Sequence, residues 1–301
     1  MISVNTIDLA PLPPTHLGTS KDGTPWEFDE LLVAPSSVTK RISDPLMPAT
    51  TGGKFFAKLY EISDPAIAGP GPRYFAAGFR FGITDIRCVN IFCHPNPHHA
   101  GMEDNDYVGL NGNWSRLYRY IQYFGVQLAA GASNMVLVMP MFNNATWGNL
   151  GSFRLRWHDI VNGILVEVQK IAWPDKPGQA AMVRNQNALT DIILSDFSAG
   201  RHVMNALRAA PQMGTFLREI WDFDGAGGGS PSSPKHGQAL LYDQGTIGLA
   251  HNVFHVPLSR WVRFPFYLSC LEDQKKKIDS LHGHIPQRLF YHATTISHLG
   301  H

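Results

Sequence analysis

Residues 191–200 read DIILSDFSAG, and the pattern of these ten residues indicates the fold class. It opens with an aspartate and three apolar residues, as expected for a strand buried on both faces of a sheet. Val203, Met204 and Leu207 then recur at helical spacing, and Pro211 ends the pattern. A buried strand that passes within a few residues into a helix is typical of an open sheet of parallel strands.

The same alternation of strand and helix runs on both sides of this stretch. Short apolar runs predict strands at three further places, residues 89–93, 135–140 and 217–221. Apolar side chains at helical spacing predict helices over 114–128 and 157–168. Because a strand, a helix and a parallel strand connect by a right-handed crossover, this order predicts a largely parallel sheet covered on both faces.

Two aromatic-rich segments come before the alternation, residues 55–62 and 74–83, with the turn-forming glycines and prolines of 69–72 between them. A short link of this kind suits an antiparallel pair of strands that enters the sheet. Residues 1–52 are punctuated by prolines, and we expect them to form an irregular arm packed on the rest. The prediction is an α/β fold, a three-layer α/β/α sandwich whose mostly parallel sheet has antiparallel entry strands, with residues 1–301 forming a single domain.

Composition and charge exclude several classes of protein. The 301 residues include 25 basic and 24 acidic side chains, and a formal net charge of +1 argues against a nucleic-acid-binding surface. The absence of a run of about 18 apolar residues argues against integral membrane association, and no secretory signal is recognisable. The 3 cysteines are too irregularly spaced for a disulfide framework or a zinc site. We expect a cytoplasmic protein without nucleic-acid partners, and a homo-oligomer stays open.

Ser198 is the residue of the 191–200 stretch to which we assign chemistry. A serine at a tight turn between a strand and a helix is directed into the cleft at the carboxyl edge of the sheet. The backbone amide of Ala199 is then at a helix N-terminus, where the helix dipole favours the negative charge of an oxyanion. The alternatives are an ordinary turn or N-cap serine, or a shifted register in which Ser195 takes this place.

Residues 196–200, Asp-Phe-Ser-Ala-Gly, resemble the Gly-x-Ser-x-Gly nucleophile elbow of the α/β-hydrolase fold. By the order of elements, the resemblance extends over residues 54–301. Asp196 departs from the family pattern, which has a small residue at this position. The resemblance implies a serine hydrolase similar to esterases and lipases, with an oxyanion hole and a catalytic triad in the chain order Ser, Asp, His.

The resemblance places a second oxyanion donor in the loop after an earlier strand, which here is HPNPHH at residues 94–99. Because proline has no amide hydrogen, Asn96 or His98 would have to donate, and Asn96 is the preferred candidate. A metal site formed by His94, His98 and His99 is the alternative, although no acidic ligand stands at a suitable spacing. We expect neither a metal nor another cofactor.

The base that the resemblance implies is a histidine late in the chain, before the last helix. His282 and His284 precede a segment in which Leu289, Phe290 and Ala293 recur at helical spacing. Histidine has a pKa near neutrality, so it can take the proton of the serine and return it to a leaving group. His284 is the preferred base, and His282 is the alternate.

The acid that orients this base has three main candidates, and Asp273 is a more distant fourth. Asp222 and Asp224 stand at the end of the strand predicted at 217–221, and Asp243 follows the next apolar stretch. Because Asp222 and Asp224 are two residues apart at a strand end, we expect only Asp224 to reach the histidine and Asp222 to bind backbone amides of the glycine loop that follows. Each of them is otherwise a turn or cap aspartate.

These residues predict hydrolysis of a carboxylic ester, of a small-molecule or acyl substrate, through an acyl-enzyme intermediate on Ser198. Three alternatives stay open. The first is a non-catalytic, hydrolase-like binding protein, which Asp196 favours. The second is an amidase that uses the same residues, and the third is a metal-assisted hydrolase that uses the His94–His99 loop.

Overall fold

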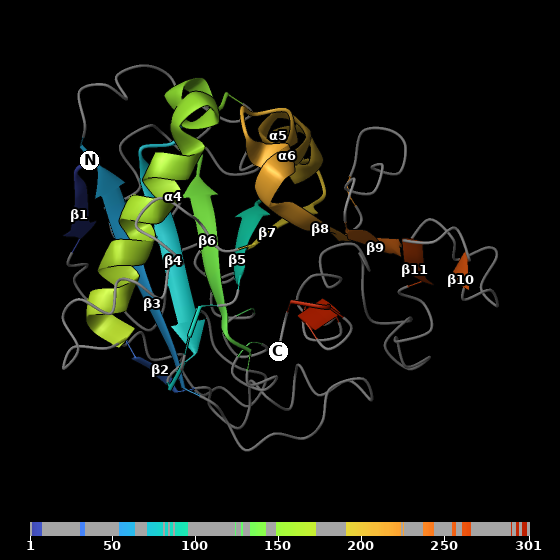
Figure 1. Ribbon diagram of the computed structural model, residues 1–301, viewed down its shortest axis with the longest axis horizontal. Coiled ribbons are helices and arrows are strands. Elements are labelled where there is room, and N and C mark those ends of the chain that lie inside the picture. The colour runs from blue at the N-terminus through green and yellow to red at the C-terminus, as the bar shows by residue number, and fades with distance from the viewer. Residues whose placement is uncertain are drawn as a thin grey trace, which may run out of the picture.

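One sheet of 11 strands organises the part of the chain that the structure, a computed structural model, describes (Figure 1). The described residues are 2–7, 31–33, 54–63, 71–80, 82–83, 85–86, 88–95, 124, 128, 133–142, 149–172, 191–223, 225, 237–243, 255–256, 261–265, 290, 293–294 and 297–299. The strands are β1 (Val4–Ile7), β2 (Leu31–Val33), β3 (Lys54–Ile62), β4 (Tyr74–Arg80), β5 (Cys88–Cys93), β6 (Met135–Met141), β7 (Asp191–Phe197), β8 (Leu217–Phe223), β9 (Gln238–Asp243), β10 (His255–Val256) and β11 (Trp261–Pro265). The helices are α4 (Gly151–Ala172), α5 (Gly200–Arg208) and α6 (Met213–Phe216).

The strands lie in the order β1-β3-β4-β6-β5-β7-β8-β9-β11-β10, with β2 paired to β3. Strands β5, β6, β7, β8, β9 and β11 are parallel to one another. The N-terminal strands β1 to β4 join them through antiparallel pairs, and β10 pairs antiparallel with β11. The predicted α/β fold, with antiparallel entry strands and a mostly parallel sheet, is confirmed.

The prediction of an irregular arm over residues 1–52 is wrong at two places. Strand β1 pairs with β3 from Val4, opposite Ile62, to Ile7, opposite Leu59. Strand β2 pairs with β3 as well. Strands of three or four residues carry too short a pattern to be recognised, and they form because β3 offers an edge to pair with.

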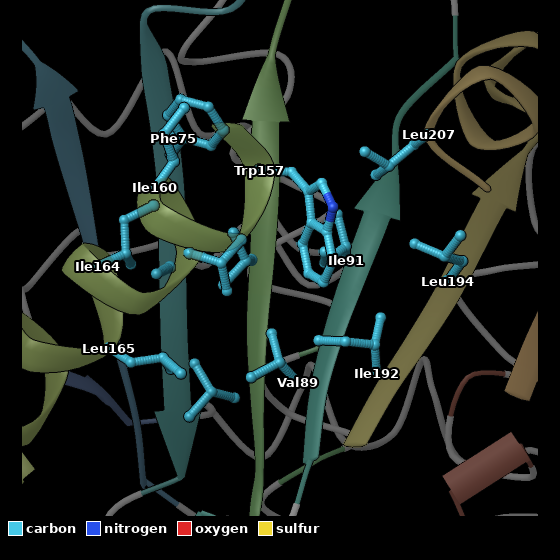
Figure 2. Packing of buried hydrophobic residues seen from close by; sticks show 14 of the residues in the cluster. Phe75, Val89, Ile91, Trp157, Ile160, Ile164, Leu165, Ile192, Leu194 and Leu207 are labelled. Carbon is cyan, nitrogen blue, oxygen red and sulfur yellow. The ribbon is translucent and has the colours of Figure 1, made fainter. Parts of the chain in front are cut away.

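Helix α4 covers one face of the sheet, as Figure 2 shows for its apolar stripe. Trp157, Ile160, Ile164 and Leu165 are buried against side chains of the strands, among them Phe75, Val89, Ile91, Ile192 and Leu194. Within this stripe, the indole nitrogen of Trp157 also donates a hydrogen bond of 2.8 Å to the carbonyl of Pro211. The helix predicted over 157–168 is therefore confirmed, and the same core continues beneath α5 through Val203, Met204 and Leu207.

Aromatic side chains cover the opposite face of the sheet. Phe124 contacts Phe92 of β5, with 4.6 Å between ring centroids, and stacks on Phe290 at 4.2 Å. Phe290 in turn contacts Trp221 and Phe223 of β8. Residues 124, 128, 290, 293 and 294 are helical. Helical residues thus lie on both faces, as the predicted three-layer arrangement requires.

Strands β7 and β8 extend further than the sequence predicts. The apolar pattern ends at Leu194 and Trp221, whereas the strands end at Phe197 and Phe223. The additional residues include Ser195, Asp196 and Asp222, all of them buried. A buried polar side chain is tolerated when it has a partner, and here the partners come from other elements of the fold.

Gly200, the first residue of α5, sets how closely this helix approaches the sheet. A Cβ atom at Gly200 would lie 2.9 Å from the carbonyl oxygen of His94 and closer still to that of Cys93. Since these are backbone atoms at the end of β5, they cannot move aside as a flexible side chain would. Only glycine allows α5 to begin directly beside the carboxyl end of β5.

We predict that Gly200→Ala lowers the free energy of unfolding by about 2 kcal/mol or more, because the new methyl group overlaps the backbone of β5. Gly214→Ala is the matched control, since a Cβ at Gly214 meets no atom within 4 Å. It should leave stability unchanged or raise it slightly. Chemical denaturation of the two variants measures the difference, and equal stabilities would contradict the close contact.

Candidate active site at the carboxyl ends of β5 and β7

The order of the strands places a topological switch point between β5 and β7. From β5 the chain goes to β6 on one side, whereas from β7 it goes through α5 to β8 on the other side. Connections that leave in opposite directions open a crevice outside the carboxyl ends of the two strands, and open α/β sheets bind their ligands there. The two segments that meet at this place are the turn 197–200 and the residues that follow Cys93.

Ser198 occupies the turn between β7 and α5 with a strained backbone. Its φ of 54° is positive, which among the described non-glycine residues is true only of Ser198 and Gln212. The Ser198 amide donates to the carbonyl of Phe223 in β8 at 3.4 Å, and its carbonyl accepts from the amide of Arg201 at 3.3 Å. A half-buried serine at positive φ, between a strand and a helix, has the backbone form of a nucleophile elbow.

Ala199 caps α5 without a side-chain hydrogen bond to the helix. The first amides of a helix have no acceptor within the helix, and the positive end of the helix dipole lies there. Because Gly200 packs on the carbonyls of Cys93 and His94, these amides lie beside the residues that follow β5. The N-terminus of α5 and the residues that follow β5 are therefore neighbours.

The His94 side chain fixes the start of the loop after β5 through two hydrogen bonds. Its Nε2 accepts a hydrogen bond of 3.0 Å from the amide of Phe142, so Nδ1 carries the proton and donates to the carbonyl of Pro95 at 2.7 Å. Burial lowers the pKa of His94 to about 4, which keeps the ring neutral at physiological pH. With both ring nitrogens engaged, His94 is a structural residue rather than a metal ligand. His98 and His99 lie outside the described residues.

Three charged side chains gather beneath the turn. Asp196 of β7 and Asp222 of β8 stand opposite each other in the sheet, and Arg201 of α5 reaches both. Arg201 Nη2 forms an ion pair with Asp222, and Arg201 Nε lies 3.6 Å from Asp196 Oδ2. All three side chains are buried. We call Asp196, Arg201 and Asp222 the buried charge cluster.

Asp196 is the less well satisfied carboxylate of this cluster. No hydrogen bond to either of its carboxylate oxygens is found among the described residues, whereas Asp222 Oδ1 also accepts from the amide of Gly225 at 2.7 Å. Burial raises the pKa of Asp196 to about 7, and the nearby Arg201 opposes this only in part. The expectation that Asp222 binds an amide of the glycine loop is confirmed.

The described residues include only some of the predicted site. Ser198, Ala199 and Asp222 are placed as above, and Asp243 ends β9, which pairs parallel with β8 at the same edge of the sheet. Asn96, Asp224, His282 and His284 lie outside the described residues, so the triad stays a prediction. Ser195 is fully buried and donates to Asn90 within the sheet, which removes it as an alternative nucleophile.

Arg201 is the residue that sequence reasoning missed. It stands in the first turn of α5, where the positive end of the helix dipole disfavours a cation. A basic residue at this place, with no acidic residue in the same turn, indicates carboxylate partners elsewhere in the fold. Asp196, which the sequence analysis noted only as a departure from a family pattern, is one of these partners.

Comparison with solved structures gives distant matches among α/β-hydrolases. The LpqC poly(3-hydroxybutyrate) depolymerase from Bordetella parapertussis matches with a TM-score of 0.32 and 14% identity over 85% of this chain and 80% of that chain. A dienelactone hydrolase-like promiscuous phosphotriesterase from metagenomic libraries matches with a TM-score of 0.24 and 11% identity over 64% of this chain and 63% of that chain. No family model and no curated protein matches the sequence.

Two further searches concern the described residues alone. None of the helices there has the length and apolar character needed to cross a membrane. No group of three or more histidine, cysteine, aspartate or glutamate side chains there could hold a metal ion. Cys88 and Cys93 are free and buried, and burial raises the pKa of each thiol well above its usual range.

We predict that Asp196 makes the stability of the protein fall as the pH rises. The folded state, with a pKa of about 7, binds this proton more tightly than the unfolded chain, with a pKa of about 3.9. The stabilisation from this proton is complete below the pKa of the unfolded chain, and it is lost as the pH rises through the pKa of the folded state. The melting temperature of the wild type, relative to that of Asp196→Asn, should therefore decrease between pH 5 and pH 8. A constant difference over this range would contradict the raised pKa.

Proposed function

We propose that this protein is a serine hydrolase that cleaves carboxylic esters through an acyl-enzyme on Ser198. The observation that carries the proposal is the strained backbone of Ser198 at the switch point, between a buried strand and the N-terminus of a helix. A side chain held there stands at the edge of the sheet where α/β proteins bind ligands. The positive φ also costs free energy, as is common at functional sites.

In the proposed reaction, Ser198 Oγ attacks the carbonyl carbon of the ester while His284 takes the hydroxyl proton. The tetrahedral oxyanion is stabilised by the amide of Ala199 and by Asn96. His284 then returns the proton to the departing alcohol, which leaves an acyl group on Ser198. A water molecule, deprotonated by His284, attacks this acyl group, and collapse of the second tetrahedral intermediate releases the acid and restores the serine.

The position of Phe290 is compatible with His284 as the base, and equally with His282. The Phe290 ring packs against Phe223, the last residue of β8, with 5.9 Å between centroids. The chain from residue 284 to residue 290 spans at most about 20 Å when fully extended. The intervening chain is therefore long enough for His284, or His282, to reach the carboxyl end of β8.

The contacts of Asp222 support Asp224 as the acid. Asp222 is occupied by Arg201 and by the amide of Gly225, so it has a structural role. Asp224 follows the end of β8 directly, at the carboxyl edge of the sheet. Asp243 ends the neighbouring strand β9 and remains the alternate.

A binding protein without catalysis is the main rival, and Asp196 was the feature in its favour. The Asp196 side chain is buried and lies against Arg201, so it adds no charge to the surface of the cleft. In the metal-assisted alternative, His94 would have to be a metal ligand, but both of its ring nitrogens are occupied by hydrogen bonds. An amidase would use the same residues and differs only in the leaving group that it accepts.

We predict that Ser198→Ala abolishes the hydrolysis of short p-nitrophenyl esters and labelling by a fluorophosphonate probe. Removing a triad nucleophile lowers kcat by a factor on the order of 10⁶. Ser195→Ala is the matched control, because Ser195 is buried in β7, the strand that leads to Ser198, with its hydroxyl bound to Asn90. That control should keep its labelling even if its melting temperature falls. A loss of only about tenfold in Ser198→Ala would refute the proposal.

For the partners of the serine, we predict that His284→Ala removes activity and that Asp224→Asn lowers kcat by about 10⁴, because the imidazole is left in the wrong tautomer. For the wild type, kcat should rise with pH through a single ionisation with a pKa of about 6.5, as the histidine loses its proton. Near-normal turnover in His284→Ala, with loss in His282→Ala, would exchange the two histidines. Near-normal turnover in Asp224→Asn, with loss of turnover in Asp243→Asn, would assign the role of the acid to Asp243 at the end of β9.

A further inference from the structure

The buried charge cluster links three elements that meet at the proposed site. Arg201 belongs to α5, the helix that begins at the elbow, and its partners Asp196 and Asp222 belong to β7 and β8. Asp196 stands two residues before Ser198. Asp222 stands two residues before Asp224. The guanidinium of Arg201 thus connects β7, which precedes the proposed nucleophile, to β8, which precedes the proposed acid.

The residues on either side of Asp224 are both fixed with respect to this cluster. The carbonyl of Phe223 accepts the amide of Ser198 at 3.4 Å, and the amide of Gly225 donates to Asp222 Oδ1 at 2.7 Å. Gly225 also lies directly on the cluster, since a Cβ there would stand 2.7 Å from Arg201 Nη2 and from Asp196 Oδ2. The position of the chain just after β8 therefore depends on the position of the Arg201 side chain.

Guanidinium chemistry suits this role better than an ammonium group would. Arginine offers several N–H donors in a rigid plane, so separate nitrogens can face two carboxylates at once. Here Nη2 faces Asp222 while Nε faces Asp196. The exposed fraction of the Arg201 residue is 5%, so water does not screen these charges effectively.

We infer that Arg201 is a positioning residue, which holds the turn that carries Asp224 in register with the elbow that carries Ser198. The inference rests on the proposed function, and it adds a residue that acts through others rather than on the substrate. Displacing the acid relative to the base should slow the chemical step without weakening substrate binding, so the effect belongs in kcat and not in KM.

The experiment compares four proteins by kcat, KM and amide hydrogen exchange: the wild type, Arg201→Lys, Arg218→Met and a triple variant. The triple variant, Arg201→Met with Asp196→Asn and Asp222→Asn, removes the cluster without leaving unpaired buried charges. Arg218→Met is the matched control, because Arg218 pairs with Asp191 at 3.1 Å and so joins the same two strands at their amino ends.

We expect kcat for p-nitrophenyl butyrate to fall about tenfold in Arg201→Lys and about 100-fold in the triple variant, with KM within about twofold. Amides in the peptide 222–225 should exchange faster in both variants. Arg218→Met should leave kcat within about twofold and the exchange of 222–225 unchanged. A folded triple variant with wild-type kcat, or equal changes in Arg218→Met, would overturn the inference.

The exchange measurement separates this inference from the proposed function. If Ser198→Ala hydrolyses the ester as fast as the wild type, the proposed function fails, whatever the Arg201 variants do. The structural part of the inference, that Arg201 ties residues 222–225 to α5, is then tested by hydrogen exchange alone: faster exchange of 222–225 in Arg201→Lys supports it. Unchanged exchange overturns it.

Discussion

The contact of Gly200 with the backbone at the end of β5 is the constraint on which the proposed site depends. It brings the N-terminus of α5 against the carbonyls of Cys93 and His94. Any side chain at this position would push the helix away from the sheet. The amide of Ala199 would then move away from the loop after β5, and the two halves of the proposed oxyanion hole would separate. Close packing and the proposed catalysis therefore both require glycine at this position.

Burying three charged side chains, those of the buried charge cluster, carries an electrostatic cost. If both aspartates were ionised, one arginine would face two carboxylates in a buried place, and the cluster would carry a net negative charge. The raised pKa of Asp196 relieves this, because a proton on Asp196 leaves a neutral pair of Arg201 and Asp222. Buried ion pairs contribute little net stability, and their best-attested use is to specify one arrangement among several. At this place, the arrangement specified is that of the elbow relative to the turn after β8.

The fold was largely predictable because apolar patterns are local, whereas the limits of its elements were not. Strands β5, β6, β7 and α4 follow from runs or stripes of apolar residues that can be read from the sequence alone. The ends of β7 and β8 could not be read in this way, because Asp196 and Asp222 are polar and their charged partner, Arg201, belongs to a different element. Strands β1 and β2 form for a similar reason, since β3 supplies their partner.

The turn at Ser198 was predictable because its signal is the junction of two local patterns, a strand and a helix. The proposed partners of Ser198 carry no such signal, since a histidine or an aspartate in a loop has the same sequence neighbourhood whatever its role. What the structure adds is the reason why the strain at Ser198 persists. A serine at a φ of 54° would relax if its surroundings allowed it, at a gain of about 1–2 kcal/mol. Its amide is held by Phe223, its carbonyl by Arg201 and the next turn by Gly200. Strain that is held in place from three sides gives no benefit to stability, so its retention is best explained by a use for the Ser198 side chain.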